Sequence, residues 1–277
     1  MCARYTLTAE EKEILKENGY TLVGNYQPDA NIAITDFGFV ITSDEPDVVQ
    51  RMSWGIVPPD AESKVPEFSS FNIRSEDVLK RTNYEPLLRA RKTCLVIADG
   101  FYEAEHLSGD DKRPWRFVTE RKLFCFAGIW SEWFDPITLE SYRTYAIMTC
   151  EANELVGEIH KEKRMPVILH KWEESMWLNK KLSVDELLSL CVPYPANKMT
   201  RYRVSKKVNS VSTKLRPNKD LRLIDPVEDE PRQQNMFDAN EAPAAKPAER
   251  KFKNTTKKSK TPKKPDSSPG MDLFNSQ

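Results

Sequence analysis

The sequence predicts an α+β fold in which a mixed, barrel-like β core is accompanied by short peripheral helices. Three observations lead to this prediction. Aromatic and β-branched residues fall in many short runs. The helical patterns between these runs are brief, and strands and helices do not alternate regularly as in a parallel α/β sheet. Because no linker-like composition interrupts residues 1–224, we expect residues 2–224 to form one domain.

The expected strands are short and follow one another along most of the chain. They lie at residues 30–41, 48–54, 94–103, 115–119, 123–129, 144–149, 165–169 and 200–204. The expected helices lie at residues 85–91, 152–158, 172–178 and 184–190. Thr8 and Glu11 have the spacing of a capping box, which predicts a further short helix that ends near Asn18.

The end of the chain differs in composition from the rest. Residues 225–245 carry six acidic residues and one arginine, whereas residues 246–264 carry nine lysines and arginines and one acid. Neither segment has helical or strand periodicity. We therefore expect residues 225–277 to be a disordered charged tail. It would act either as a solubilising extension or by non-specific attraction to nucleic acid.

The composition argues against several classes of protein. No apolar run approaches the roughly 20 residues of a membrane span, and the first residues do not resemble a secretory signal. We expect a cytoplasmic monomer without membrane contact, associated with the nucleoid if the source is bacterial. The five cysteines are odd in number and form no CxxC pair, which argues against a disulfide framework and a cysteine-based zinc site. We expect no metal and no cofactor.

Cys2 suggests a specific chemistry because of its position. Removal of Met1, which precedes a small residue, would leave Cys2 with a free α-amine and a thiol. An α-amine has a pKa of about 7.7–8.0, so a good fraction is an unprotonated nucleophile at neutral pH. Such a 1,2-aminothiol forms a Schiff base with an aldehyde, and its thiol then closes a thiazolidine ring. Taken alone, a Met-Cys start strongly favours an ordinary second residue.

Three further segments present polar groups that could line a site. Asn72, Arg74 and Glu76 alternate along an extended segment, so their side chains would point to one side, as a solvated surface or in a polar cleft. Glu103 follows an apolar strand and could serve as an acid or as an anchor for an amine. His160 lies between an expected helix and an expected strand, where functional groups are often presented. A single histidine is also often structural.

Six short motifs follow one another along the chain. They are Met1-Cys2-Ala3-Arg4-Tyr5, Trp54-Gly55-Ile56-Val57-Pro58, Asn72-x-Arg74-x-Glu76, Asp99-Gly100-Phe101-Tyr102-Glu103, Ala127-Gly128-Ile129-Trp130, and His160 followed by Arg164-Met165-Pro166. In their order and spacing they resemble the SRAP (SOS-response-associated peptidase) family, of the HMCES/YedK type, over about residues 2–205. The resemblance implies an α+β fold around a barrel-like core. It also implies a positively charged channel for single-stranded DNA and a thiazolidine crosslink to abasic sites in the DNA damage response.

The resemblance also implies roles for individual residues. Cys2 matches the nucleophile of the family, and Asn72 matches the asparagine that holds the crosslinked group. Arg74 matches an arginine that contacts DNA phosphate. Glu103 matches the glutamate that positions the Cys2 amine. His160 matches a histidine that helps to open the deoxyribose ring, a step that suits a group with a pKa near about 6.5.

The expected partner is single-stranded DNA that contains abasic sites. Arg4, Arg74 and Arg164 are the candidate phosphate contacts. Because residues 1–224 are close to neutral overall, affinity for DNA would have to come from local clustering of positive charge. We also expect this affinity to fall as salt increases.

The sequence departs from the family pattern at three places. Ala3 stands where glycine is usual, and Ala104 stands where a tryptophan would offer an aromatic surface to a base. In the family, fewer residues usually separate the histidine from Arg-Met-Pro. Here Lys161-Glu162-Lys163 lies between His160 and Arg164. The placement of His160 is therefore the part of the resemblance that most needs a structure.

Three functions remain open from the residues alone. The first is an abasic-site processing enzyme that crosslinks to DNA, with lyase-like or autopeptidase activity as a possible addition. The second is a thiol peptidase in which Cys2 and His160 form a nucleophile–base pair. The third is a non-catalytic module that binds single-stranded DNA through its arginines and aromatic residues. A peptidase would need no DNA for its activity. The DNA binding of a non-catalytic module would be unaffected by Cys2→Ser.

Overall fold

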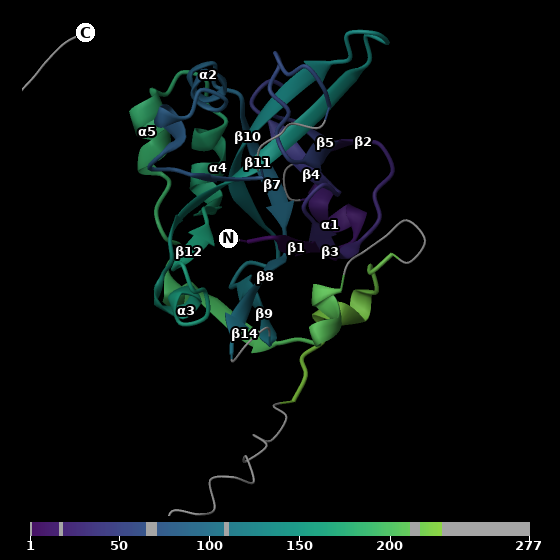
Figure 1. Cartoon of the computed structure of the whole chain (residues 1–277), viewed down its shortest axis with the longest axis vertical. Coiled ribbons are helices and arrows are strands. Elements are labelled where there is room, and N and C mark those ends of the chain that lie inside the picture. Colours follow the sequence, from purple (N-terminus) through teal and green to yellow (C-terminus); the bar gives the residue numbers. More distant parts are fainter. Residues whose placement is uncertain (1, 17–18, 65–70, 108–110, 211–216, 229–277) are drawn as a thin grey trace, which may run out of the picture. The chain divides into compact units, whose positions relative to one another are not determined.

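Five strands of the fold close into a ring. The computed structural model describes residues 2–16, 19–64, 71–107, 111–210 and 217–228. In spatial order the ring consists of β11 (Ser141–Glu151), β10 (Phe124–Phe134), β7 (Thr93–Ala98), β4 (Phe37–Thr42) and β5 (Val48–Trp54). Neighbouring strands are antiparallel, except that β5 returns to β11 in parallel and so closes the ring. The predicted mixed, barrel-like core is therefore confirmed (Figure 1).

Four short strands extend this barrel. They are β2 (Thr21–Val23) beside β5, β6 (Asn72–Arg74) and β12 (Arg164–Pro166) beside β11, and β13 (Ile168–Leu169) beside β10. The pairing of β6 is parallel and places Arg74 opposite Thr149, whereas β12 is antiparallel and places Pro166 opposite the same residue. Two segments with predicted site residues thus flank the end of β11.

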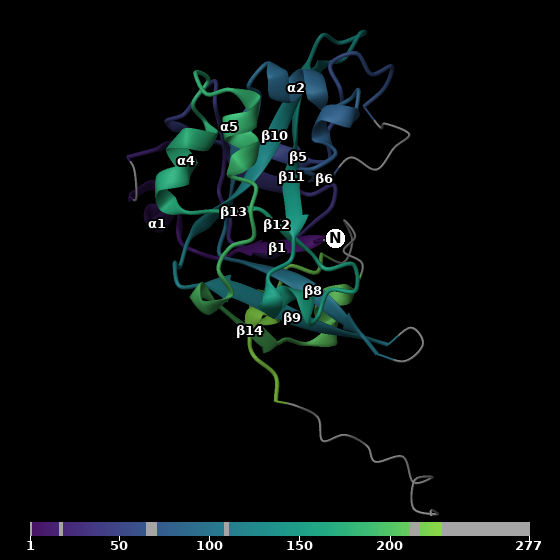
Figure 2. The same cartoon turned by 90° about the vertical axis from the view of Figure 1, so that its left-hand side faces the viewer.

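A second sheet carries the amino terminus of the chain. Its five antiparallel strands, in spatial order, are β14 (Met199–Arg203), β9 (Lys112–Thr119), β8 (Gly100–His106), β1 (Arg4–Leu7) and β3 (Asp29–Ala33). In both side views β8, β9 and β14 lie at the opposite end of the fold from the tip of the β10–β11 hairpin (Figure 2). Because β8 follows β7 after Asp99 alone, the barrel and the second sheet meet beside the first residues of the chain.

The helices are short and lie around the sheets. The α-helices are α1 (Glu11–Lys16), α2 (Glu85–Arg89), α3 (Glu154–Gly157), α4 (Lys171–Trp177) and α5 (Val184–Ser189), and the 3-10 turns are η1 (Val78–Lys80), η2 (Ala196–Lys198), η3 (Lys206–Asn209) and η4 (Leu221–Ile224). Ser183 caps α5 through a capping box with Glu186. The short peripheral helices of the prediction are thus confirmed. Among the described residues, no helix has the length and apolar character to cross a membrane.

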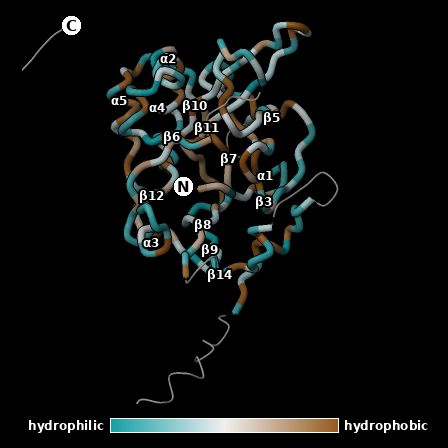
Figure 3. Tube along the Cα trace, viewed as in Figure 1, coloured by the Kyte–Doolittle hydropathy of each residue, from teal (hydrophilic) through white to brown (hydrophobic). Residues whose placement is uncertain are grey.

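Large apolar side chains fill the core. Trp54, Trp130 and Trp177 are almost fully buried, and the indole of Trp177 donates hydrogen bonds to the carbonyls of Cys94 and Gly128 on neighbouring strands. Strand β7 in the middle of the fold is mostly hydrophobic (Figure 3). Burial of this kind is the main driving force for folding, and it fixes the frame on which the polar site is built.

Several predicted elements differ in detail from the structure. The expected strand at residues 30–41 is two strands, because Thr35 adopts a left-handed backbone (φ 74°) in the turn between β3 and β4. The expected strand at 94–103 divides at Asp99, and the strand at 165–169 divides at Val167. The capping box of Thr8 is wrong, because the Thr8 hydroxyl donates to Asp99 and α1 begins later, at Glu11.

The predicted tail lies almost entirely outside the described residues, which end at residue 228. The division of the chain at residues 224 and 225 stays a prediction. Of the cysteines other than Cys2, Cys94, Cys125 and Cys150 are buried and Cys191 is half-buried, and no disulfide joins the described cysteines.

Candidate functional site

Cys2 lies two residues before β1 begins and is almost completely buried. Its carbonyl accepts a hydrogen bond of 2.6 Å from the side-chain amide of Asn72 on β6. Its thiol donates to the carbonyl of Arg4 at 3.3 Å. Burial, together with the nearby negative charge of Glu103, raises the pKa of the thiol far above its ordinary value. The Cys2 sulfur is therefore a protonated thiol at neutral pH.

Asp99 explains why the amino-terminal strand lies at this place. Its carboxylate accepts hydrogen bonds from the hydroxyl of Thr6, from the backbone N–H and hydroxyl of Thr8, and from the N–H of Ala9. Arg116 on β9 pairs with the same carboxylate at 3.0 Å, and both side chains are 7% exposed. A single buried acid thus ties the first residues of the chain to the β7–β8 turn and to β9.

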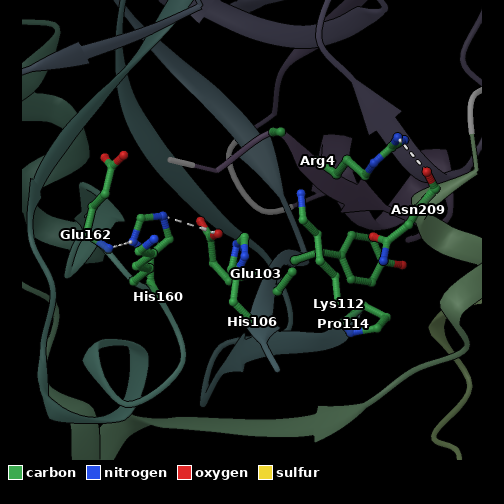
Figure 4. Close-up of a pocket in the computed structure, with 12 residues that line it drawn as sticks. Arg4, Glu103, His106, Lys112, Pro114, His160, Glu162 and Asn209 are labelled. Carbon is green, nitrogen blue, oxygen red and sulfur yellow. Dashed lines mark hydrogen bonds and ion pairs between the residues drawn. The ribbon is translucent and has the colours of Figure 1, made fainter. Parts of the chain in front are cut away.

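Glu103 and His160 meet although they are far apart in sequence. Glu103 stands on β8, and His160 follows α3, which Asn153 caps by accepting a hydrogen bond from the N–H of Val156. The backbone N–H of His160 donates to the carbonyl of Val156. The Nε2 atom of His160 and Oε2 of Glu103 are 3.5 Å apart, and 7% of each side chain is exposed. The structure therefore brings the predicted acid and the predicted histidine into one pair (Figure 4).

The loop after His160 fixes the orientation of its ring. The Nδ1 atom accepts hydrogen bonds from the backbone N–H groups of Glu162 at 3.2 Å and Arg164 at 3.3 Å. An acceptor Nδ1 assigns the ring hydrogen of the neutral imidazole to Nε2. Nε2 is the atom that faces Glu103, so His160 presents a hydrogen-bond donor to this carboxyl group.

Burial moves the pKa values of the two groups in opposite directions. Desolvation raises the pKa of Glu103 to about 8 and lowers that of His160 to about 4, because it disfavours the charged form of each group. At neutral pH both are mostly uncharged. In the part of the chain that the structure describes, Oε1 of Glu103 and Oδ1 of Asn72 are buried and have no hydrogen-bond partner. Buried acceptors of this kind are usually satisfied by a ligand or water.

A cleft of about 470 Å³ opens beside this pair. Glu103 and His160 line it together with Ala3 and Arg4, which follow Cys2 directly. The other residues of its wall are Tyr102, Ala104, His106, Lys112, Pro114, Lys161, Glu162 and Asn209. Figure 4 shows Arg4 and Lys112 on one side of Glu103 and His160 on the other. Ala3 and Ala104, two of the departures from the family pattern, thus both border the site.

The three predicted phosphate contacts lie in different surroundings. The guanidinium of Arg4 is half-buried and donates to Oδ1 of Asn31 at 3.1 Å and to the carbonyl of Asn209 at 3.5 Å. Arg74 is exposed, and its Nη2 atom lies 3.7 Å from the carboxylate of Glu162. Both residues remain accessible to a ligand from the cleft or its rim.

Arg164 lies in more enclosed surroundings than Arg4 and Arg74. Its side chain is 10% exposed. The guanidinium donates to both carboxylate oxygens of Glu76, at 2.5 and 3.0 Å, and to the carbonyl of Thr149 at 2.9 Å. Together these bonds use three of the five N–H donors of the guanidinium. The surroundings of Arg164 favour a structural role over the phosphate contact that the sequence suggested.

Sequence reasoning missed the basic wall of the cleft and the anchor at Asp99. His106 and Lys112 come together because they pair at the end of the β8–β9 hairpin. Asn209 reaches the cleft from η3, far along the chain. The apolar and polar pattern of β8 and β9 would have suggested the hairpin, but not which of its faces borders the site.

The chain is similar in sequence to proteins of one family. Residues 1–211 match the family described as SOS response associated peptidase (SRAP). A Bacillus subtilis protein named abasic site processing protein YoqW is 35% identical over 217 residues, which cover 76% of this chain and 95% of the relative. The Gallus gallus abasic site processing protein HMCES is 32% identical over 188 residues, or 59% of this chain and 54% of the relative.

Solved structures show the same fold. A crystal structure of a Bacteroides thetaiotaomicron protein has a TM-score of 0.70 at 24% identity and covers 82% of this chain and 100% of its own. A Bordetella bronchiseptica protein has a TM-score of 0.66 at 22% identity, with 74% of this chain and 100% of its own covered. At these identities the likeness concerns the fold alone.

Proposed function

This chain belongs to the SOS response associated peptidase (SRAP) family, and on that premise we propose that it processes abasic sites in DNA by linking to them covalently through Cys2. The observation that carries the proposal is the buried Glu103–His160 pair, 3.5 Å apart, in the wall of a cleft that begins at the residue after Cys2. The names of the relatives support the substrate class.

The reaction uses both functional groups of Cys2 once Met1 is removed. The free α-amine attacks the aldehyde of the opened abasic sugar, and loss of water leaves an imine. The neutral thiol then adds across the C=N bond. Sulfur bonds to the carbon, the proton ends on nitrogen, and a five-membered thiazolidine results. A protonated thiol suits this step, because the proton it carries is the one the nitrogen requires.

Glu103 and His160 handle the protons of this reaction. Glu103 has a pKa of about 8, close to the value of about 7.7–8.0 of an α-amine. The ionised fraction of Glu103 would pair with the amine, which positions it, and would take its proton. An abasic sugar is mostly a closed hemiacetal, and His160 would assist its opening through a hydrogen bond from Nε2–H to the ring oxygen, which ends with the proton that the C1 hydroxyl releases. In the free protein this Nε2–H faces Glu103. Asn72 holds the carbonyl of Cys2, and Arg4 and Arg74 contact phosphate.

The thiol peptidase is the weaker alternative. A peptidase cysteine is activated by a lowered pKa and by a base in hydrogen-bond contact with its sulfur. Here burial raises the pKa of the Cys2 thiol, and the sulfur donates to a backbone carbonyl. The hydrogen-bearing nitrogen of His160 faces Glu103. These surroundings suit addition of a neutral thiol to an imine better than attack of a thiolate on a peptide.

The proposal is tested with a labelled single-stranded oligonucleotide that contains one abasic site. Incubation with the mature protein should give a slower band on a denaturing gel. The same strand with an intact base, and one with a tetrahydrofuran analogue that lacks the aldehyde, should give none. Cys2→Ser should abolish the stable band. If no product survives denaturation, or if Cys2→Ser gives as much as the wild type, the proposal is wrong.

A further inference from the structure

Glu162 lies beside Arg74, the exposed arginine to which the proposed function assigns a phosphate contact. Its carboxylate lies 3.7 Å from Nη2 of Arg74, and the side chains are 58% and 48% exposed. Glu162 also lines both the cleft beside Glu103 and a neighbouring hollow of about 620 Å³ that includes Arg74, Ser75 and Lys163. The residue thus stands between the two hollows, at the arginine that a strand passing from one to the other would meet.

The loop around His160 holds Glu162 in this position. The backbone N–H of Glu162 donates to Nδ1 of His160, and the N–H of Lys163 donates to the carbonyl of His160. The carbonyl of Lys163 in turn accepts from Ala152, and Lys163 has a left-handed backbone (φ 50°). The carboxylate therefore projects from a loop that several backbone hydrogen bonds define. Its place beside Arg74 follows from the same loop that orients the imidazole.

We propose that Glu162 is a specificity-determining residue that competes with DNA phosphate for Arg74. This inference rests on the proposed function. In the free protein the carboxylate neutralises the guanidinium, so a strand gains the Arg74 contact only by displacing Glu162. Intact single strands, held by phosphate contacts alone, are thereby weakened as competitors. A strand with an abasic site becomes covalently linked and depends less on this contact. The extended Lys161–Lys163 segment is what brings a carboxylate to this place.

The size of the effect follows from the exposure of the pair. Exposed ion pairs have modest strength, so Glu162→Gln should tighten binding of an intact single strand by about 1.5- to 5-fold. The charge of Arg74 also becomes available to replace counter-ions on the strand. The slope of log affinity against log salt should therefore become steeper by about 0.7, the value for one phosphate contact on a single strand.

The experiment measures fluorescence anisotropy of a labelled single strand without an abasic site, at several salt concentrations. It compares wild type, Glu162→Gln, Arg74→Ala and the double variant. Glu140→Gln removes the same charge at the turn of the β10–β11 hairpin and serves as the control. The competition predicts a gain for Glu162→Gln that becomes smaller in the Arg74→Ala background, and no gain for Glu140→Gln.

Two outcomes would overturn the proposal. If Glu162→Gln binds no more tightly than wild type, the carboxylate does not compete. If its gain is equal or larger in the Arg74→Ala background, Glu162 acts by general repulsion and not through Arg74. The crosslinking assay with the wild-type protein is the separate test of the proposed function. If the protein crosslinks but the effects of Glu162→Gln and Arg74→Ala are not coupled, this inference alone is refuted. If the protein neither crosslinks nor binds a single strand, the inference and the proposed function are both refuted.

Discussion

The imidazole of His160 and the carboxyl group of Glu103 lie 3.5 Å apart in the wall of the cleft, and 7% of each side chain is exposed. Burial raises the pKa of Glu103 to about 8 and lowers that of His160 to about 4. The pair is therefore not a permanent ion pair at neutral pH. It consists of two neutral groups that each reach their charged form at some cost, which is a property of groups that exchange protons during a reaction.

The raised pKa of Glu103 predicts how stability depends on pH. Between pH 4.5 and 8 the folded protein keeps a proton on Glu103 that the unfolded chain loses, so stability contributed by this group falls as pH rises through that window. Glu103→Gln, which cannot ionise, should not show this loss. Melting temperatures of the two proteins should be similar near pH 4 and should diverge in favour of the variant toward pH 8. Parallel curves across this range would contradict the assignment.

Asp99 should be a major determinant of stability. Asp99→Asn leaves the buried guanidinium of Arg116 without its carboxylate, a loss that typically costs about 3–5 kcal/mol. It also weakens the hydrogen bonds to Thr6 and Thr8 that hold the amino-terminal strand. Asp44→Asn, which disrupts partly exposed pairs with Lys92 and Lys180, should cost at most about 1 kcal/mol. Urea unfolding of both variants measures the difference, and equal costs would argue against the anchor.

Arg74 and Arg164 should differ in what their loss affects. Arg164→Ala removes a part-buried pair with Glu76 and a buried bond to Thr149, so it should reduce stability by about 1–3 kcal/mol. Arg74 is exposed, and Arg74→Ala should change stability by at most about 0.5 kcal/mol while it weakens binding of every single strand to a similar degree. Unfolding curves and anisotropy titrations on both variants test this division. Equal DNA affinity of Arg74→Ala and wild type at several salt concentrations would refute its role.

The sequence was sufficient to predict the class of fold and most of its strands. The runs of β-branched and aromatic residues on β5, β7 and β10 mark buried strands, and the structure has strands there. The turns were harder to predict. Thr35 ends a strand through a left-handed backbone that threonine rarely adopts, and Asp99 ends one because its carboxylate collects donors from β1 and β9. Such causes are tertiary, and a local pattern does not contain them.

The site was predictable in its residues but not in its electrostatics. The motifs pointed to Glu103 and His160, which meet in the structure. Both groups are neutral because β8 and the loop after α3 bury them. The spacing of residues in the sequence does not reveal this burial. Arg164 shows the opposite case. Its sequence context suggested a phosphate contact, but its orientation on β12 directs the guanidinium to Glu76. Whether an arginine is exposed or buried depends on the register of its strand.

The last prediction concerns the order of steps at Cys2, Glu103 and His160. Cys2→Ala keeps the amine but lacks the thiol, so it should form only an imine that borohydride traps and that otherwise hydrolyses. Glu103→Gln keeps the shape of the site but cannot take the proton of the amine. It should form the crosslink more slowly, and the product should still survive denaturation. Denaturing gels with and without borohydride separate these two results.

His160→Ala should slow the step that exposes the aldehyde. General acid–base assistance is typically worth about 10²- to 10⁴-fold, so the rate of crosslinking should fall within that range. If ring opening is the step affected, a strand that carries an aldehyde unable to close into a hemiacetal should recover part of the loss with His160→Ala and little with Glu103→Gln. The Nε2–H of His160, which faces Glu103 in the wall of the cleft while Nδ1 accepts from the N–H groups of Glu162 and Arg164, is the group that this comparison isolates. Wild-type rates of crosslinking and reversal in His160→Ala would show that another group carries the proton.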